Sequence, residues 1–295
     1  MRSIESKRTS TNKIYLDLTL RDKTGEINAK FWDADPALEK EFLENSILCV
    51  KALVKEWSGN KQLSIESIRP VTDLDGQNIR DFIASAPQDS QSMYKILHSY
   101  IGQIKDQDIY QITSTIVEKY QDKILYYPAA QKNHHAIHGG WLYHIVTMLG
   151  LGEKIVEVYP FLNRDLLYGG IILHDIAKLD EMDANELGIV KDYTVEGHLL
   201  GHLVQGVKLV DKIAESIGAD PEKSLLLQHM IASHHYKGEW GSPKTPMIPE
   251  AEVLHYIDMI DAAMYDMHKA LSTTKEGSFS EKVWTLGRKV YRSSQ

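Results

Sequence analysis

The first 72 residues alternate between apolar and polar positions, which is the pattern of half-buried β-strands. In IYLDLTL the residues Ile14, Leu16 and Leu18 share one face, and EINAKFW continues the alternation after a DKTG turn. A short helix over about Pro36–Leu43 precedes ILCVKALVKEW, an SGNK turn and QLSIESI. This order is typical of a small five-stranded β-barrel of the OB type. The chain begins close to the first strand, so we expect that strand to be shortened.

The outward positions of this predicted barrel combine aromatic rings with a cation. Tyr15, Lys30 and Trp32 lie on the side opposite the apolar face. OB barrels bind single strands across their outer face by stacking bases on aromatic rings and pairing phosphates with cations. We therefore expect these three residues to bind substrate. The alternative is that Tyr15 and Trp32 only cover a seam to a second domain.

The period of the pattern changes after residue 72. Residues 73–90 are polar, and apolar residues then recur at helical spacing, first in QSMYKILHSYIGQI and DIYQITSTIVEKYQDKI. We predict an OB-fold domain over residues 1–72, a linker over 73–90 and an all-helical bundle over 91–295.

Charge and composition narrow the class of protein. A net charge of −8 argues against a surface that coats nucleic acid broadly, but residues 1–72 carry +1 and the remainder −9. A local nucleic-acid contact therefore fits the first domain best. No apolar run reaches transmembrane length and the start MRSIESKRTSTNK is polar, so we expect no membrane partner and a cytoplasmic location. A single cysteine, Cys49, excludes an intramolecular disulfide and a cysteine-built zinc site.

Histidines are concentrated in the helical part, where 12 of the 13 lie between His134 and His268. Five successive predicted helices each place one or two metal-ligating side chains among apolar residues. Buried unpaired ionisable groups cost several kcal/mol, and a shared cation removes much of that cost. A helix bundle would bring the side chains together in its interior. The predicted ligands are His144, His174, Asp175, His202, His234, His235 and Asp258.

The donor types limit the metal. Nitrogen and oxygen ligands without thiolate suit Mn²⁺, Fe²⁺ or Mg²⁺. His174 and Asp175 project about 100° apart on a helix, so Asp175 can bridge a second ion, and both one and two ions stay open. Lys178 lies one turn after His174 and is expected to hold a phosphate oxygen.

Other histidines flank this set. His198 and His202 are four residues apart, which places them on one face of a predicted helix. We expect His134, His135 and His138, which precede the first ligand helix, to contact substrate or phosphate.

The order of these motifs resembles the HD-domain metal-dependent phosphohydrolase superfamily over roughly residues 130–265. HDIAK is similar to its HD-x-x-K element, and HH followed by KGEWGSP and IPEAEVLHYIDMIDA is similar to its later elements. With the OB barrel in front, the chain resembles the YhaM-type bacterial 3′–5′ exoribonucleases, notably in YLDLTLRDKTGEINAKFWDA and GGWLYHIVTMLGL. The resemblance implies Mn²⁺-favoured cleavage of single-stranded RNA from the 3′ end to nucleoside 5′-monophosphates, with single-stranded DNA as a further substrate.

The residues support a mechanism of this kind. Asp175 would anchor the cations that activate the attacking water, and Lys178 would neutralise charge on the phosphoryl oxygens, so both are predicted to be catalytic. We also expect a homo-oligomer.

Two alternatives stay open. The same site would also suit hydrolysis of small nucleotides or cyclic dinucleotides with the barrel as a regulatory module. A catalytically inactive nucleic-acid-binding protein is the other alternative. Tyr15, Lys30 and Trp32 favour the exonuclease over the first, and the complete ligand set argues against the second.

Overall fold

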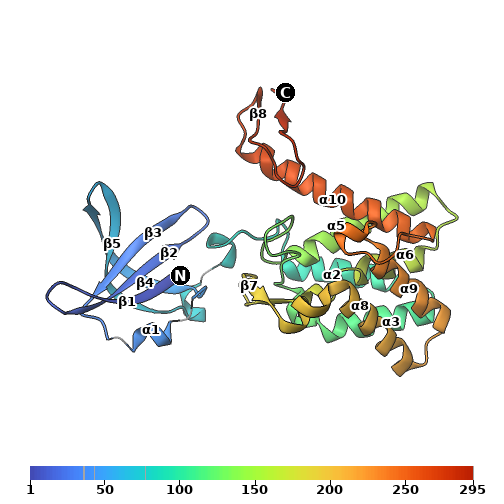
Figure 1. Cartoon of the computed structure of the whole chain (residues 1–295), viewed down its shortest axis with the longest axis horizontal. Coiled ribbons are helices and arrows are strands. Elements are labelled where there is room, and N and C mark those ends of the chain that lie inside the picture. The colour runs from blue at the N-terminus through green and yellow to red at the C-terminus, as the bar shows by residue number, and fades with distance from the viewer. Residues whose placement is uncertain (36, 43, 77, 295) are drawn as a thin grey trace. The chain divides into compact units, whose positions relative to one another are not determined.

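The computed structural model describes residues 1–35, 37–42, 44–76 and 78–294. The chain divides into two compact units, Met1–Ser85 and a second unit that begins at Ala86 (Figure 1). The finer domain limits, with a linker over residues 73–90, stay a prediction. Pro36 and Leu43, the ends of the predicted short helix, lie outside the described residues, and helix α1 spans Leu38–Glu41.

The first unit is built around one five-stranded sheet, as predicted for an OB-type domain. Its strand order is β1-β2-β3-β5-β4, in which β3 and β5 run parallel and the other neighbours antiparallel. Among the described residues no ladder joins β1 to β4, so hydrogen bonds do not close the sheet into a complete barrel. The strands are β1 Ser3–Arg8, β2 Ile14–Arg21, β3 Glu26–Trp32, β4 Leu48–Trp57 and β5 Asn60–Pro70.

The predicted alternation places the core of this unit correctly. Leu16 and Leu18 of β2 and Ala29 of β3 are buried, together with Ile4 of β1 and Ile65 of β5. The first strand, expected to be shortened, has six residues and pairs with β2 along its whole length. Burying a Leu or Ile side chain contributes about 1.5–3 kcal/mol, which is why the register is fixed by these positions.

The second unit is a helical bundle, in agreement with the prediction. Side chains of Asp106 and Asp220 accept hydrogen bonds from backbone N–H groups in the first turns of α3 and α9, and Pro221 occupies the first turn of α9. The helices of eight or more residues are α2 Ser90–Ile101, α3 Gln107–Lys119, α5 Gly140–Val158, α6 Arg164–Leu173, α8 Val195–Ile217, α9 Pro221–Ser233 and α10 Pro249–Thr273. The shorter ones are α4 Gln121–Ile124 and α7 Lys178–Glu181, with 3₁₀ turns at Asp73–Asp75, Ile79–Asp81 and Gly238–Trp240.

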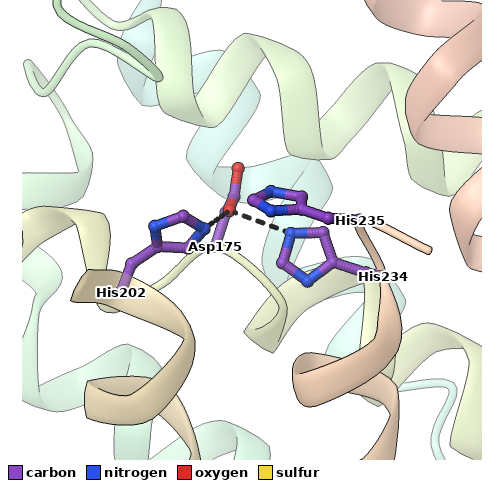
Figure 2. A group of neighbouring side chains, drawn as sticks. All are labelled: Asp175, His202, His234 and His235. Carbon is purple, nitrogen blue, oxygen red and sulfur yellow. Dashed lines mark ion pairs between the residues drawn. The ribbon is translucent and has the colours of Figure 1, made fainter. Parts of the chain in front are cut away.

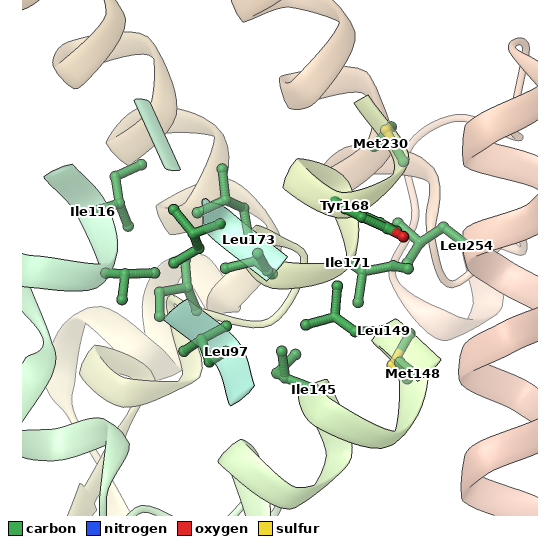
Figure 3. Close-up of a cluster of buried hydrophobic side chains, with 14 of the residues drawn as sticks. Leu97, Ile116, Ile145, Met148, Leu149, Tyr168, Ile171, Leu173, Met230 and Leu254 are labelled. Carbon is green, nitrogen blue, oxygen red and sulfur yellow. The ribbon is translucent and has the colours of Figure 1, made fainter. Parts of the chain in front are cut away.

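Helix α6 lies in the middle of the bundle and is buried over most of its length. Its Tyr168 and Ile171 pack among Met148 of α5, Met230 of α9 and neighbouring apolar residues (Figure 3). At the crossing with α9 the side chain of Met230 fills the space beside Gly170, where a Cβ would lie 2.1 Å from Met230 Cε. This close packing fixes the end of α6, where the predicted HD pair stands.

Two short hairpins interrupt the helical unit, which the all-α prediction did not include. Strands β6 (Met182–Ala184) and β7 (Val190–Tyr193) pair across a turn in which Asn185 accepts from the N–H groups of Leu187 and Ile189. Strands β8 (Ser278–Phe279) and β9 (Tyr291–Arg292) lie at the far end of α10 (Figure 1). Strands of two to four residues are too short to show a period in the sequence. None of the described helices is long and apolar enough to cross a membrane.

Candidate metal centre

Asp175 stands at the centre of the predicted ligand set, in a tight turn rather than inside a helix. Helix α6 ends at Leu173, and bonds between residues three apart carry the chain to α7 at Lys178. The prediction of one continuous helix through HDIAK is therefore wrong in this detail. Asp175 is buried, and its Oδ1 lies 3.4 Å from His202 Nε2 and 3.6 Å from His234 Nε2 (Figure 2).

The seven predicted ligands form two adjoining groups. In the first, Asp175 meets His202, His234 and His235, and in the second His144, His174 and Asp258 come together; within each group the ligand atoms lie within 4.8 Å of one another. The groups join where His174 Nε2 approaches Asp175 Oδ2 at 3.4 Å. Side chains from α5, the α6–α7 turn, α8, the end of α9 and α10 thus converge.

Each of the five histidines in these groups bonds an oxygen through Nδ1. The acceptor is a backbone carbonyl for His174, His234 and His235, at 2.7–2.8 Å. It is Glu181 for His202 at 3.2 Å and Asp261 for His144 at 2.6 Å. An oxygen acceptor requires the hydrogen on Nδ1, which leaves the lone pair on Nε2.

The Nε2 atoms that result are suited to a cation. Those of His144, His174, His202 and His234 are buried and make no hydrogen bond with any described residue, and neither does Asp175 Oδ1. Buried polar atoms are normally hydrogen-bonded, so a cluster of five such atoms aimed at one another points to a ligand. Neutral imidazole and carboxylate donors, with an oxygen partner behind each imidazole, are the usual surroundings of a divalent cation. The residues therefore fit one or two such ions.

The electrostatics keep Asp175, His234 and Asp258 in the state that binds metal. His144 must lose a proton first, since the two carboxylates beside it outweigh its burial and raise the pKa of its imidazole to about 9. Burial opposes a charge on Asp175, but Lys178 and His174 outweigh it and hold the pKa of the carboxyl well below its usual range. Burial lowers the pKa of His234 to about 3, so its imidazole is neutral at neutral pH. Burial also opposes the charge of Asp258, yet His144 keeps the pKa of that carboxyl low.

Lys178 contacts the carboxylate at the centre. Its Nζ donates to Asp175 Oδ2 at 2.7 Å, and the side chain is largely buried. Burial lowers the pKa of this lysine, but Asp175 reverses the effect and the net shift is upward. An ammonium group has three N–H donors, so this bond leaves donors for a phosphoryl oxygen.

Two carboxylates behind the histidines were not among the predicted site residues. Asp261 Oδ2 accepts from His144 Nδ1 at 2.6 Å and from His135 Nε2 at 2.7 Å. Glu181 Oε1 accepts from both the backbone N–H and Nδ1 of His202. The available signal for Asp261 was its place three residues after Asp258, on the same side of α10.

The histidines predicted to contact substrate occupy different surroundings. His135 is buried, 1% exposed, and its bond to Asp261 fits support of His144 better than contact with substrate. His134 is half-buried with its ring 5.8 Å from that of His144, and burial, reinforced by His144 and Lys178, lowers its pKa to about 4. His138 is half-buried and its carbonyl accepts from the N–H of Ala86.

His198 does not share the site with His202, contrary to the prediction of one common helical face. Gly201 has φ 67° and ψ 164°, so the helix is kinked between them. His202 turns inward to Asp175, whereas His198 is exposed near Asp192.

In the first unit, the three predicted binding residues lie together on the sheet. Tyr15 of β2 pairs in register with Trp32 of β3, and their ring centroids are 4.8 Å apart. Lys30 Nζ lies 5.2 Å from the centroid of Tyr15 and 5.5 Å from that of Trp32. The cluster is partly open to solvent, with Trp32 43% exposed, and so offers an aromatic face next to a cation.

Comparison with known proteins identifies both units. The HD domain family matches residues 141–263, and the OB-fold nucleic acid binding domain family matches residues 3–71. The chain is 43% identical over 282 residues to the 3′-5′ exoribonuclease YhaM of Bacillus subtilis (strain 168), covering 96% of this chain and 89% of that protein. It is 42% identical over 291 residues to the 3′-5′ exoribonuclease YhaM of Geobacillus sp. (strain WCH70), covering 99% and 89%. No solved structure matches this chain.

Proposed function

Because this chain belongs to the 3′-5′ exoribonuclease YhaM family, we propose that it is a divalent-cation-dependent enzyme that removes nucleotides from the 3′ end of single-stranded RNA. The observation that carries the proposal is the convergence of seven donors from five parts of the helical unit in two groups, which meet where His174 approaches Asp175. An OB-type unit with an aromatic and cationic cluster supports a single-stranded substrate.

The seven predicted ligands would hold one or two cations. A bound divalent cation supplies Lewis acidity, which activates water and stabilises negative charge on a phosphoryl oxygen. Asp175 lies where the two ligand groups meet, so its negative charge would attract a cation in either group. Lys178, fixed on Asp175, would donate to a phosphoryl oxygen and stabilise charge that develops there.

The sheet of the first unit would hold the strand. Bases would stack on Tyr15 and Trp32, and Lys30 would pair with a phosphate. Binding energy from these nucleotides would help to fix the scissile bond at the metal centre. Since stacking does not require a particular base, the substrate range would be broad.

We propose Mn²⁺ as the favoured cation, with Fe²⁺ and Mg²⁺ as the other candidates, because the donors are imidazole nitrogens and carboxylate oxygens without thiolate. We propose nucleoside 5′-monophosphates as the products and single-stranded DNA as a further substrate. The test is to follow 5′-labelled RNA and DNA strands of one sequence with each metal and to identify the released nucleotides. Hydrolysis of free nucleotides without shortening of either strand would contradict the proposal.

Asp175→Asn tests the site itself. The amide keeps the shape but loses the charge, so RNA shortening and cation binding should both fall by more than about a hundredfold, since even outer partners of metal ligands are worth 10–100-fold. Asp192→Asn is the matched control, because Asp192 is exposed and is not one of the predicted ligands. Unchanged RNA turnover in Asp175→Asn would exclude this metal centre as the active site.

Self-association is a further part of the proposal. The side of α10 that faces away from the bundle core carries the exposed residues Tyr256, Met259, Ile260 and Met264. A helix that is apolar on both sides is normally covered on both sides. We propose that a second copy of the chain covers this one.

A further inference from the structure

The loop between α9 and α10 carries an aromatic ring and a cation that the metal centre does not use. Trp240 is 48% exposed, which is high for an indole, and Lys237 Nζ lies 4.7 Å from its ring centroid. Lys237 and Trp240 lie two and five residues after His235 in the sequence. Their chemistry has no role in holding a cation, because a protonated lysine and an indole are not metal ligands.

Hydrogen bonds fix this loop to the metal centre. His235 Nδ1 donates to the carbonyl of Trp240 at 2.7 Å, and the backbone N–H of His235 donates to Ser242 Oγ at 3.0 Å. The N–H groups of Trp240 and Ser242 both donate to the carbonyl of Lys237, at 3.0 and 3.2 Å. Gly241 completes the turn with φ 101°. The exposed indole is therefore carried by backbone that directly orients a predicted ligand.

The same pair of groups occurs in the first unit. There Lys30 lies 5.2 and 5.5 Å from the rings of Tyr15 and Trp32. An exposed aromatic face beside an ammonium group suits a nucleobase and its phosphate, and stacking of this kind tolerates any base. Two such clusters on one chain suggest two contacts with one single strand.

We infer that Trp240 and Lys237 form a nucleotide subsite at the metal centre, in which the indole stacks on a base near the 3′ end and the ammonium group pairs with a phosphate. The inference rests on the proposed function and extends it, since it assigns residues that hold the end of the strand. The subsite would also position the end of the strand for cleavage. The backbone of Trp240 is hydrogen-bonded to the predicted ligand His235, so a base stacked on the indole would be held in a fixed place relative to the metal centre.

Steady-state kinetics on a single-stranded RNA, with metal binding measured in parallel, test the subsite. Trp240→Ala should raise KM about tenfold, within the range that stacking on one aromatic ring provides, and change kcat much less. Trp240→Phe keeps an aromatic face and should restore most of the affinity. Lys237→Ala should raise KM and weaken its dependence on salt, because one phosphate contact is lost.

Phe161→Ala is the matched control, because Phe161 is an aromatic residue 73% exposed between α5 and α6 and is neither a predicted ligand nor part of either aromatic and cationic cluster. It should leave KM unchanged. An unchanged KM in Trp240→Ala overturns the subsite, and so does a loss of cation affinity equal to the loss of activity, since the residue would then act only through His235. Failure of the wild-type protein to shorten RNA at all would instead contradict the proposed function.

Discussion

The imidazoles of the metal centre are oriented by two kinds of acceptor. Carbonyl groups behind His174, His234 and His235 belong to the backbone and come with the fold. The side-chain carboxylates of Glu181 and Asp261 accept from His202 and His144, and a substitution can remove such a carboxylate. At the residue scale, Asp261 therefore allows the orientation of a ligand to be tested without removing the ligand.

Asp261→Asn should weaken cation binding by about 10–100-fold, which is the usual effect of losing an outer carboxylate partner. The amide can present nitrogen or oxygen to His144, so the hydrogen is no longer fixed on Nδ1. Titration calorimetry of chelator-treated protein measures the change, and RNA turnover should fall in parallel. Asp211→Asn, at an exposed position on α8, is the control. Equal cation affinity in both variants would show that Asp261 has no positioning role.

His134 provides a prediction about pH. Burial, together with His144 and Lys178, lowers its pKa to about 4, although Asp258 opposes this, whereas an unfolded histidine titrates near 6.5. Between these values the unfolded chain binds the proton first, so His134 makes the free energy of unfolding fall by about 1.4 kcal/mol per pH unit as pH decreases from 6.5 to 4. Above pH 6.5 and below pH 4 it has no further effect.

Urea unfolding of chelator-treated protein at several pH values measures this slope. His134→Gln should show a shallower decrease between pH 6.5 and 4, because the side chain no longer titrates. Asn133→Gln, a change at the exposed neighbouring residue, which does not titrate, should keep the wild-type slope. Identical slopes in the wild-type protein and His134→Gln would contradict the lowered pKa.

The candidate ligands that the structure brings together could be selected from the sequence, but the partners of their Nδ1 atoms could not. His144, His174 and Asp258 stood out because ionisable groups recurred on apolar helix faces. Asp261 and Glu181 bond to Nδ1 atoms of residues 117 and 21 positions away, and no local spacing encodes such a contact. His135 shows the same limit, since its burial against Asp261 depends on the packing of α10.

At the scale of elements, a single glycine decides which histidine of α8 reaches the metal centre. Periodicity treats α8 as a regular helix, on which His198 and His202 share a face. Gly201 breaks the regular path with a positive φ, and the backbone N–H of His202 donates to Glu181 at 3.0 Å. Hydrophobic spacing carries no information on such a dihedral angle, so the sequence pattern could not separate the two residues.

Gly201→Ala should destabilise the fold by about 1–3 kcal/mol, because residues with a side chain rarely adopt this conformation. If the kink relaxes to regular helix, His202 turns away from Asp175 and cation affinity falls. Gly150→Ala is the matched control: Gly150 lies inside α5, has no positive φ, and an added Cβ would meet no atom within 4 Å. It should be neutral or stabilising by up to about 1 kcal/mol. Urea unfolding measures the stability of both variants, and metal titration measures their cation affinity. Equal stability and equal cation affinity in the two variants would contradict a role for the kink.

At the scale of the whole molecule, the change of period after residue 72 predicted an OB-type unit followed by a helical one, and both are confirmed. The short hairpins β6–β7 and β8–β9 escaped prediction because they depend on turns and on packing, not on a repeated pattern. The pattern of α10 also gave no warning of a second apolar side. Its residues Leu254 and Ile257 are buried, and Tyr256 and Ile260 on the other side are exposed.

The C-terminal hairpin follows α10 and carries further exposed apolar residues. Thr285 donates to Asp266 of α10, and Arg292 donates to the carbonyls of Leu271 and Thr274, so the hairpin is attached to the end of the helix. It adds three exposed aromatic residues, Phe279, Trp284 and Tyr291. At 150–250 Å² for each large aromatic side chain, the exposed parts of helix and hairpin together amount to roughly several hundred Å² per copy. A stable interface buries about 800 Å² per partner, so this area would supply a large part of one. An exposed apolar area of several hundred Å² is already unusual for a chain that stays monomeric.

A second copy is the partner that fits best, because it is present wherever the chain is made. Most soluble oligomers are symmetric, and in a two-fold dimer the same surface of each copy forms the interface. Sedimentation should therefore show a dimer for the wild-type protein. Replacing Ile260 and Met264 by Glu places two charges per copy in the interface and should yield monomers with unchanged cation affinity, since both residues point away from the bundle core. Leu225→Glu, at an exposed position on α9, should leave the dimer intact. A wild-type protein that sediments as one chain at every concentration would exclude self-association, and a dimer that survives both charges would place its interface elsewhere.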